Sequence, residues 1–75
     1  VNTVIEAKCT RKTMNLKKLT EEIEADIVHY DADYIYFYIY DREKIIKDKY
    51  TFEINFNRNF DGKVVRAVIL QPVHM

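Results

Sequence analysis

The chain has 75 residues, 48% of them hydrophobic, with one glycine and one proline, which indicates one small α/β domain and excludes a disordered chain. Twelve basic and twelve acidic residues cancel, so the overall charge gives no argument for a nucleic-acid or membrane partner. No apolar run approaches the ~20 residues of a membrane-spanning helix, and the single cysteine, Cys9, excludes an internal disulfide and favours a cytoplasmic location.

The run from Val1 to about Cys9 is short and largely apolar, which is typical of a buried strand. Its two charged residues, Glu6 and Lys8, are two positions apart and therefore lie on one face. Because the chain opens at Val1 and enters this apolar run at once, we interpret residues 1–75 as a single domain cut from inside a longer protein.

The segment from Leu16 to Tyr30 has apolar residues at steps of three and four, which predicts an amphipathic helix. Thr13 or Asn15 is its predicted N-cap. Asp26 lies four residues before Tyr30 on one helix face, so the pair is a candidate to support a site on the first strand. The alternative is a helix-end carboxylate and a core tyrosine.

The rest of the chain predicts two more strands and a short helix. Tyr34–Tyr40 holds only aromatic and β-branched residues, which predicts a strand with both faces covered. Tyr50–Phe60 alternates like a strand but also has Phe52 and Phe56 four residues apart, and Asp48 as an N-cap favours a short, weak helix here. After a tight turn at Asp61-Gly62, Val64–Leu70 is the last strand. The order predicts a three-stranded α/β fold of the type βαβ(α)β.

Glu6 and Lys8 are the residues with the clearest chemistry. Two charges on a buried strand are costly to desolvate unless they pair or serve a site. A carboxylate binds a hard cation such as Mg²⁺, and a neighbouring ammonium stabilises charge that develops on a phosphate. Glu6 and Lys8 are therefore candidate catalytic residues, and Glu6 and the backbone carbonyl of Ala7 are candidate metal ligands. The alternative is an ordinary ion pair between Glu6 and Lys8.

Every charged residue between Glu6 and Glu21 is basic. Three of these basic residues, Arg11, Lys12 and Lys17, are candidates for contact with the phosphates of a nucleic acid. The alternative is a solvated loop whose lysines pair along the following helix.

The order of these motifs resembles a known family. They are Ile5-Glu6-Ala7-Lys8, Thr10-Arg11, Glu24-Ala25-Asp26-Ile27 with Tyr30, Tyr40-Asp41-Arg42-Glu43 with Ile45, Phe52-Glu53 and a closing strand that ends at Pro72. In this order they resemble the C-terminal half of the DpnII/MboI-like branch of the PD-(D/E)XK restriction-endonuclease superfamily. The likeness covers nearly the whole chain.

The resemblance implies hydrolysis of DNA with Mg²⁺ or Mn²⁺, in which Glu6 is the metal-binding carboxylate and Lys8 the catalytic lysine. It also implies an Asp on a preceding strand, which the five residues before Glu6 cannot supply. We therefore expect the chain to be the C-terminal part of a larger nuclease-like domain and to be inactive by itself. A function of a different class is a non-catalytic module that keeps this fold and dimerises or binds a partner through an exposed sheet edge.

Overall fold

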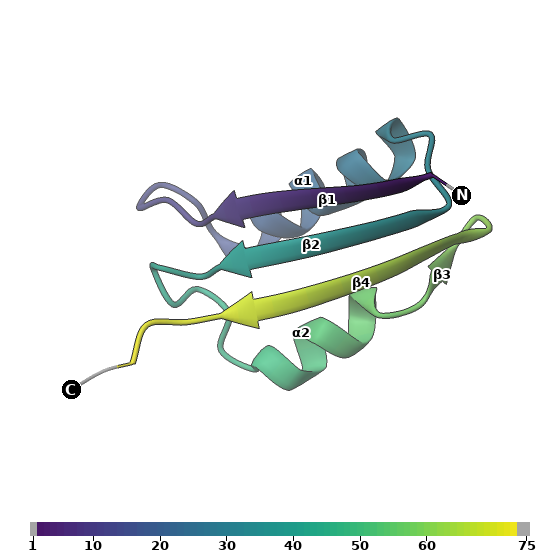
Figure 1. The fold of residues 1–75 in the computed structure, drawn as a ribbon. Helices are drawn as coiled ribbons and strands as arrows, with labels where there is room; N and C mark the ends of the chain where they lie inside the picture. The colour runs from purple at the N-terminus through teal and green to yellow at the C-terminus, as the bar shows by residue number, and fades with distance from the viewer. Residues whose placement is uncertain (1, 74–75) are drawn as a thin grey trace.

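The computed structural model describes residues 2–73, which form a mixed four-stranded sheet with two helices (Figure 1). The elements in chain order are β1 (Thr3–Cys9), α1 (Leu16–His29), β2 (Tyr34–Tyr40), α2 (Lys49–Phe56), β3 (Asn59–Phe60) and β4 (Lys63–Leu70). The strand order is β1-β2-β4-β3, in which β1, β2 and β4 are parallel and β3 pairs antiparallel with β4. The predicted βαβ(α)β fold is confirmed, with the two-residue strand β3 in addition.

Both helices begin after a side-chain cap that the sequence predicts. Asn15 accepts a hydrogen bond from the Lys18 N–H at 2.8 Å, and Asp48 accepts one from the Thr51 N–H at 3.1 Å. The helix α2 is shorter than the predicted Tyr50–Phe60 segment, because the chain leaves the helix early and pairs as β3 with β4. Neither helix of the described chain is long and apolar enough to cross a membrane.

The turn between β3 and β4 is confirmed at Asp61 and Gly62. Their φ angles are 53° and 82°, in the left-handed region. Glycine adopts this region without a steric penalty, which explains why the only glycine of the chain stands here.

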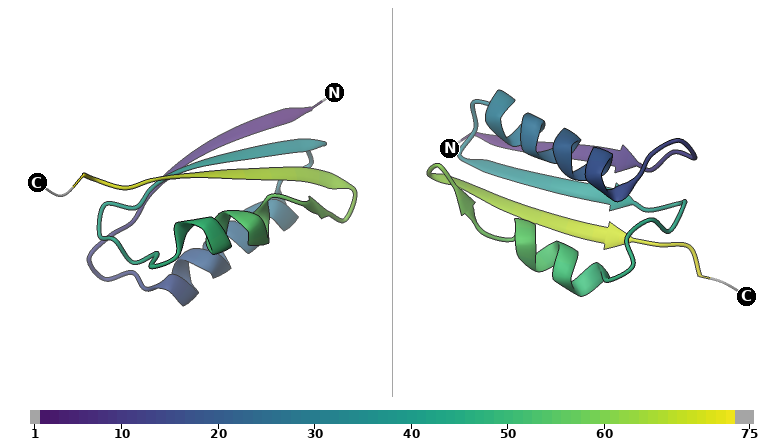
Figure 2. Two further views of the ribbon diagram at one scale, coloured as in Figure 1. Left: turned by 90° about the horizontal axis from the view of Figure 1, so that it is seen from below. Right: turned by 180° about the vertical axis from the view of Figure 1, so that it is seen from behind.

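The prediction that both faces of Tyr34–Tyr40 are covered is wrong for the described residues. Both helices lie on the same face of the sheet (Figure 2), so they bury every second side chain of β2 and leave the alternate tyrosines on the other face. Tyr38 and Tyr40 are 46% and 42% exposed. Large exposed residues on this open face are Ile5, Tyr38, Tyr40, Val68 and Leu70. Parallel sheets normally have both faces covered, so this open apolar face is unusual for its class.

Candidate functional site

Glu6 and Lys8 project together from β1, which is an edge strand of the sheet. The alternation of the strand directs both side chains toward α1 and the Ala7 side chain toward the open face. Both charged side chains are partly buried beneath α1, and 16% of the Lys8 side chain remains exposed. The two groups therefore share one side of the sheet and are not sealed from solvent.

Asp26 of α1 and Tyr30, the C-cap residue that follows α1, contact these two charged groups. The Tyr30 hydroxyl donates a hydrogen bond to Glu6 Oε1 at 2.8 Å, and Lys8 Nζ lies 2.6 Å from Asp26 Oδ2. Asp26 Oδ2 is buried and accepts no well-aligned hydrogen bond from a described residue, so its contact with Lys8 is an ion pair only. No ion pair within residues 2–73 joins Glu6 to Lys8, so the alternative of an ordinary pair between them is wrong.

The spacing of the two elements explains why these contacts form. Four residues of α-helix advance about 6 Å, and two residues of strand advance about 6.6 Å. The helix α1 runs back against the direction of β1, so the step from Asp26 to Tyr30 matches the step from Lys8 to Glu6 (Figure 2). The structure thus brings the two predicted supporting residues to the two candidate catalytic residues.

The Tyr30 phenol has a pKa above its ordinary value. The main cause is its hydrogen bond to the Glu6 carboxylate, and burial and the negative charges of Glu6 and Asp26 act in the same direction. The phenol therefore keeps its proton and donates to Glu6 throughout the neutral range. Glu6 is consequently held by a neutral donor and has no cationic partner within the described chain.

The backbone carbonyl of Ala7 points to the free edge of β1. At the two ends of the β1–β2 ladder, the Thr10 N–H donates to the Tyr40 carbonyl and the Asn2 carbonyl accepts from the Tyr34 N–H, each at 3.1 Å. In a parallel ladder every second residue bonds to the neighbouring strand through both backbone groups. The even-numbered residues of β1 form these bonds to β2. The backbone N–H and C=O groups of Ala7, an odd-numbered residue, therefore point away from β2.

The described residues do not by themselves complete a metal centre. Within residues 2–73 no three Asp, Glu, His or Cys side chains gather closely enough to hold an ion. Glu6 and the Ala7 carbonyl offer fewer oxygen ligands than Mg²⁺ requires. A metal site built on Glu6 needs further ligands from outside this set.

The three predicted phosphate-binding residues lie where β1 ends and α1 begins. Arg11 forms an exposed ion pair with Glu22, whose closest atoms are 3.0 Å apart. Lys12 and Lys17 are exposed, and no carboxylate of residues 2–73 lies within ion-pair distance of them. The two lysines are thus free to meet an anion, whereas Arg11 has to leave its partner first.

Asp41, which directly follows β2 and is fully buried, appears in the family motif Tyr40-Asp41-Arg42-Glu43, but sequence reasoning assigned it no role. Its carboxylate accepts four hydrogen bonds from side chains and backbone of residues 2–73. Its Oδ1 accepts hydrogen bonds from the Thr10 hydroxyl and the Ile45 N–H, and its Oδ2 from the Ile46 N–H and the Gln71 amide. These four donors lie between 2.8 and 3.1 Å away and come from segments that follow β1, β2 and β4. Asp41 therefore ties the ends of three parallel strands together.

The pKa of the Asp41 carboxyl is below its ordinary value, although burial, the largest single effect, acts to raise it. The hydrogen bonds from Gln71, Ile46, Ile45 and Thr10 together outweigh burial, because all of them favour the ionised carboxylate. Asp41 has no free position for a ligand, so its function is to hold the structure. The signal in the sequence is an acid placed between a wholly apolar strand and the Ile45-Ile46 pair.

The mixed four-stranded sheet with two helices is consistent with a βαβ(α)β fragment of the restriction-endonuclease-like class of folds. The family comparison is more specific, since the REase_DpnII-MboI family model matches residues 1–72. The chain therefore belongs to the DpnII-MboI restriction endonuclease family, as its motifs predict. Searches of curated proteins and of solved structures find no match. Restriction endonucleases generally use divalent metal ions.

Proposed function

We propose that this chain is the C-terminal part of a metal-dependent DNA endonuclease domain, which hydrolyses phosphodiester bonds. The observation that carries the proposal is the pair of charges on β1. Glu6 and Lys8 share one side of an edge strand, and both remain partly exposed. Lys8 pairs with Asp26 of α1 and Glu6 accepts from Tyr30, the C-cap of α1, so the two groups do not pair with each other. Family membership supports DNA as the substrate.

In this proposal the side chains on and above β1 have separate roles. Glu6 and the Ala7 carbonyl at the free edge bind Mg²⁺ or Mn²⁺, together with ligands from outside residues 2–73. The Lys8 ammonium stabilises negative charge on the phosphate. Tyr30 orients the Glu6 carboxylate through a hydrogen bond and Asp26 orients Lys8 through an ion pair, as supporting partners of catalytic groups commonly do.

The proposed phosphate contacts of this site are three basic residues between the end of β1 and the first turn of α1: Arg11, Lys12 and Lys17. They follow β1 directly, and the two lysines have no partner to displace within the described chain. Each contact adds affinity that does not depend on the DNA sequence and that weakens with salt.

Metal contact is tested in a protein that carries the whole endonuclease domain, because the described residues alone offer too few ligands. Addition of Mn²⁺ should broaden the backbone amide NMR signals of residues 6–9 in the unmodified protein, and Glu6→Gln should abolish this broadening. Glu24→Gln, which removes an exposed carboxylate from α1, is the matched control and should leave the broadening unchanged.

The activity itself is tested in a protein that carries the whole endonuclease domain. We expect Glu6→Gln and Lys8→Met each to lower the rate of DNA cleavage with Mg²⁺ or Mn²⁺ by about 100-fold or more. Cleavage that persists in both variants would remove these residues from the mechanism.

A second function, a non-catalytic interaction or dimerisation module, is favoured by the free edge of β1 and the open face of the sheet. In this proposal two copies pair through the β1 edge. Analytical ultracentrifugation distinguishes the two functions. A dimer at micromolar concentration, together with no response of residues 6–9 to Mn²⁺, supports the module, whereas a monomer whose residues 6–9 respond supports the endonuclease.

A further inference from the structure

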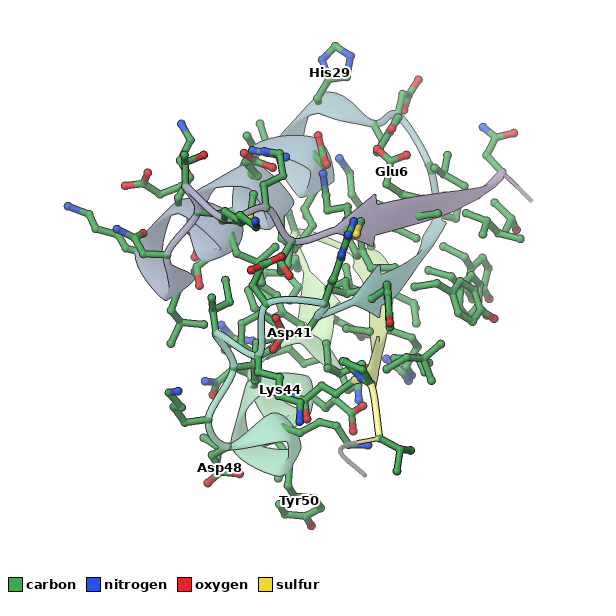
Figure 3. All side chains as sticks on the ribbon, turned by 90° about the vertical axis from the view of Figure 1, so that its left-hand side faces the viewer. Glu6, His29, Asp41, Lys44, Asp48 and Tyr50 are labelled. Atoms are coloured by element: carbon green, nitrogen blue, oxygen red, sulfur yellow. The ribbon has the colours of Figure 1, made fainter. Side chains whose placement is uncertain are left out.

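Basic side chains gather at the end of the sheet where the carboxyl ends of the three parallel strands lie. This edge is that end of the sheet and is distinct from the free side of β1. This edge lies on the left of Figure 1 and faces the viewer in Figure 3. Residues 9–19 and 40–51, which form this edge, hold eight of the twelve basic residues and three of the twelve acidic residues of the chain. A chain without net charge therefore has an excess of five positive charges at one end.

Two of the three acidic residues at this edge are occupied by structural hydrogen bonds. Asp41 is fully buried beneath four donors. Asp48 caps α2 by accepting from both the N–H and the hydroxyl of Thr51. Glu43 is partly exposed, and Glu22 of α1, which lies outside these two segments, pairs with Arg11. Apart from the pair of Arg11 and Glu22, no ion pair within residues 2–73 involves the cations of this edge. The excess of positive charge is therefore presented to solvent.

The two basic loops are held together as one rigid surface. The Thr10 hydroxyl donates to Asp41 Oδ1 at 3.1 Å and accepts from the Glu43 N–H at 3.0 Å. The first loop, with Arg11, is thus bonded directly to the second loop, with Arg42. Because the two loops are hydrogen-bonded to each other, little backbone entropy is lost when a rigid polyanion binds to their cations.

Lys44 has an unusual backbone conformation in the second loop. Its φ angle is 53°, in the left-handed region that glycine and asparagine favour and lysine rarely adopts. The Asp41 carbonyl accepts from the Lys44 N–H at 3.2 Å, and the Asp41 carboxylate fixes the next two residues. Figure 3 shows Lys44 between Asp41 and Asp48 at this edge. The hydrogen bonds of Asp41 therefore hold a lysine in a conformation that glycine adopts at lower cost.

We propose that the loop of residues 41–49 is a DNA-backbone contact surface, in which Arg42, Lys44, Lys47 and Lys49 bind phosphates of a duplex. This inference rests on the endonuclease function proposed above and adds a surface separate from Glu6 and Lys8. Duplex DNA carries one negative charge per about 1.7 Å of its axis, so a row of fixed cations matches it better than it matches a single small anion. Ligands of open α/β sheets also bind beyond the carboxyl ends of the strands.

Binding of a fluorescent DNA duplex, measured by anisotropy in EDTA across a series of salt concentrations, tests this surface without any metal. Lys47→Gln/Lys49→Gln should reduce the slope of log affinity against log salt by about 1.8, at about 0.9 for each lost contact. The matched control is Arg58→Gln/Arg66→Gln, which removes the same charge from exposed residues away from this edge and should leave the slope unchanged. Equal slopes for the two double variants would overturn the proposal, as would an unmodified chain that binds no duplex at low salt.

Lys44→Gly separates a role in binding from a role in folding. Glycine suits the φ angle of this position, so the variant should unfold at an equal or higher urea concentration while it binds DNA several-fold more weakly at low salt. Unchanged DNA binding by this variant would contradict the proposed contact of Lys44.

The two proposals fail separately. If the loop variants bind DNA normally but cleavage by the complete domain depends on Glu6, the surface is wrong and the endonuclease function stands. If the loop variants lose binding but cleavage does not depend on Glu6 or Lys8, the surface stands and the catalytic assignment is wrong.

Discussion

Two carboxylates on neighbouring strands of this sheet have opposite surroundings. Asp41, at the end of β2, is fully buried and accepts hydrogen bonds from four donors. Glu6, within β1, is partly exposed and accepts one hydrogen bond, from Tyr30. The pKa of Asp41 is lowered by its donors, and the hydrogen bond to Glu6 raises the pKa of the Tyr30 phenol.

This difference in hydrogen bonding identifies Asp41 as a structural carboxylate and Glu6 as a candidate metal ligand. A carboxylate has about four positions at which it accepts hydrogen bonds, and at Asp41 all of them are used. Glu6 keeps most of its positions available and lies at the edge of the sheet, beside an unpaired backbone carbonyl. The number of donors around an acid, and not its burial alone, therefore indicates whether it can bind something else.

The largest expected effect is the loss of the Asp41 side chain. Asp41→Ala leaves four donors without an acceptor, two of them on the backbone, and should lower the free energy of unfolding by about 3 kcal/mol or more. Urea denaturation followed by circular dichroism measures this loss. The comparison variant, Glu6→Ala, should lose clearly less, and equal losses in the two variants would remove the distinction between the carboxylates.

The dependence of stability on pH tests the structural role of Asp41 in a second way. The folded pKa of Asp41 lies below the unfolded value of 3.8, so its contribution to stability is complete above that value and is lost as the pH falls through the folded pKa. The unmodified chain should therefore lose stability as the pH falls below about 4, and Asp41→Asn should lose less over the same interval. Asp48, whose pKa is also lowered, is present in both proteins and accounts for the decline that remains.

A smaller effect is expected at the pair of Glu6 and Tyr30. Glu6→Gln removes the charged acceptor, so the pKa of the Tyr30 phenol should move down toward its ordinary value of 10.0. NMR titration of the ring carbons measures this change, and the exposed Tyr50 is the internal control, which should titrate identically in both proteins. An unchanged Tyr30 titration would contradict the hydrogen bond.

The smallest effect is expected at the exposed pair of Arg11 and Glu22. The Arg11 side chain is 58% exposed, and ion pairs of this kind contribute about 0 to 1 kcal/mol, so Arg11→Gln should change the free energy of unfolding by less than about 0.5 kcal/mol. The same urea series, repeated at high salt, should reduce even this difference. A loss as large as that of Asp41→Ala would show that solvent exposure does not weaken this contact.

Features that depend on local periodicity could be predicted from the sequence. The alternation of β1 places Glu6 and Lys8 on one face, and the helical step of four places Asp26 and Tyr30 on another, as the structure shows. The caps Asn15 and Asp48 are equally local, since each bonds to a backbone N–H three residues later. The catalytic roles of these side chains stay predictions.

Features that depend on how distant segments meet could not be predicted. Tyr34–Tyr40 has the same composition whether one face or both are covered, and only the placement of α1 and α2 on one side decides this. Asp41 acquires its donors because three strand ends converge, and no spacing along the chain encodes that convergence. The strand β3 has two residues, too few for any periodic pattern.

The open face of the sheet also provides a place for a spectroscopic reporter. Cys9, the last residue of β1 and the only cysteine, is exposed and shares the alternation of Ile5 and Ala7 on that face. A fluorophore or nitroxide attached to its thiol would stand on the open face, one residue from Lys8. Its emission or mobility would then report when another helix, strand or copy covers the tyrosines, without any change to the charged groups beneath α1.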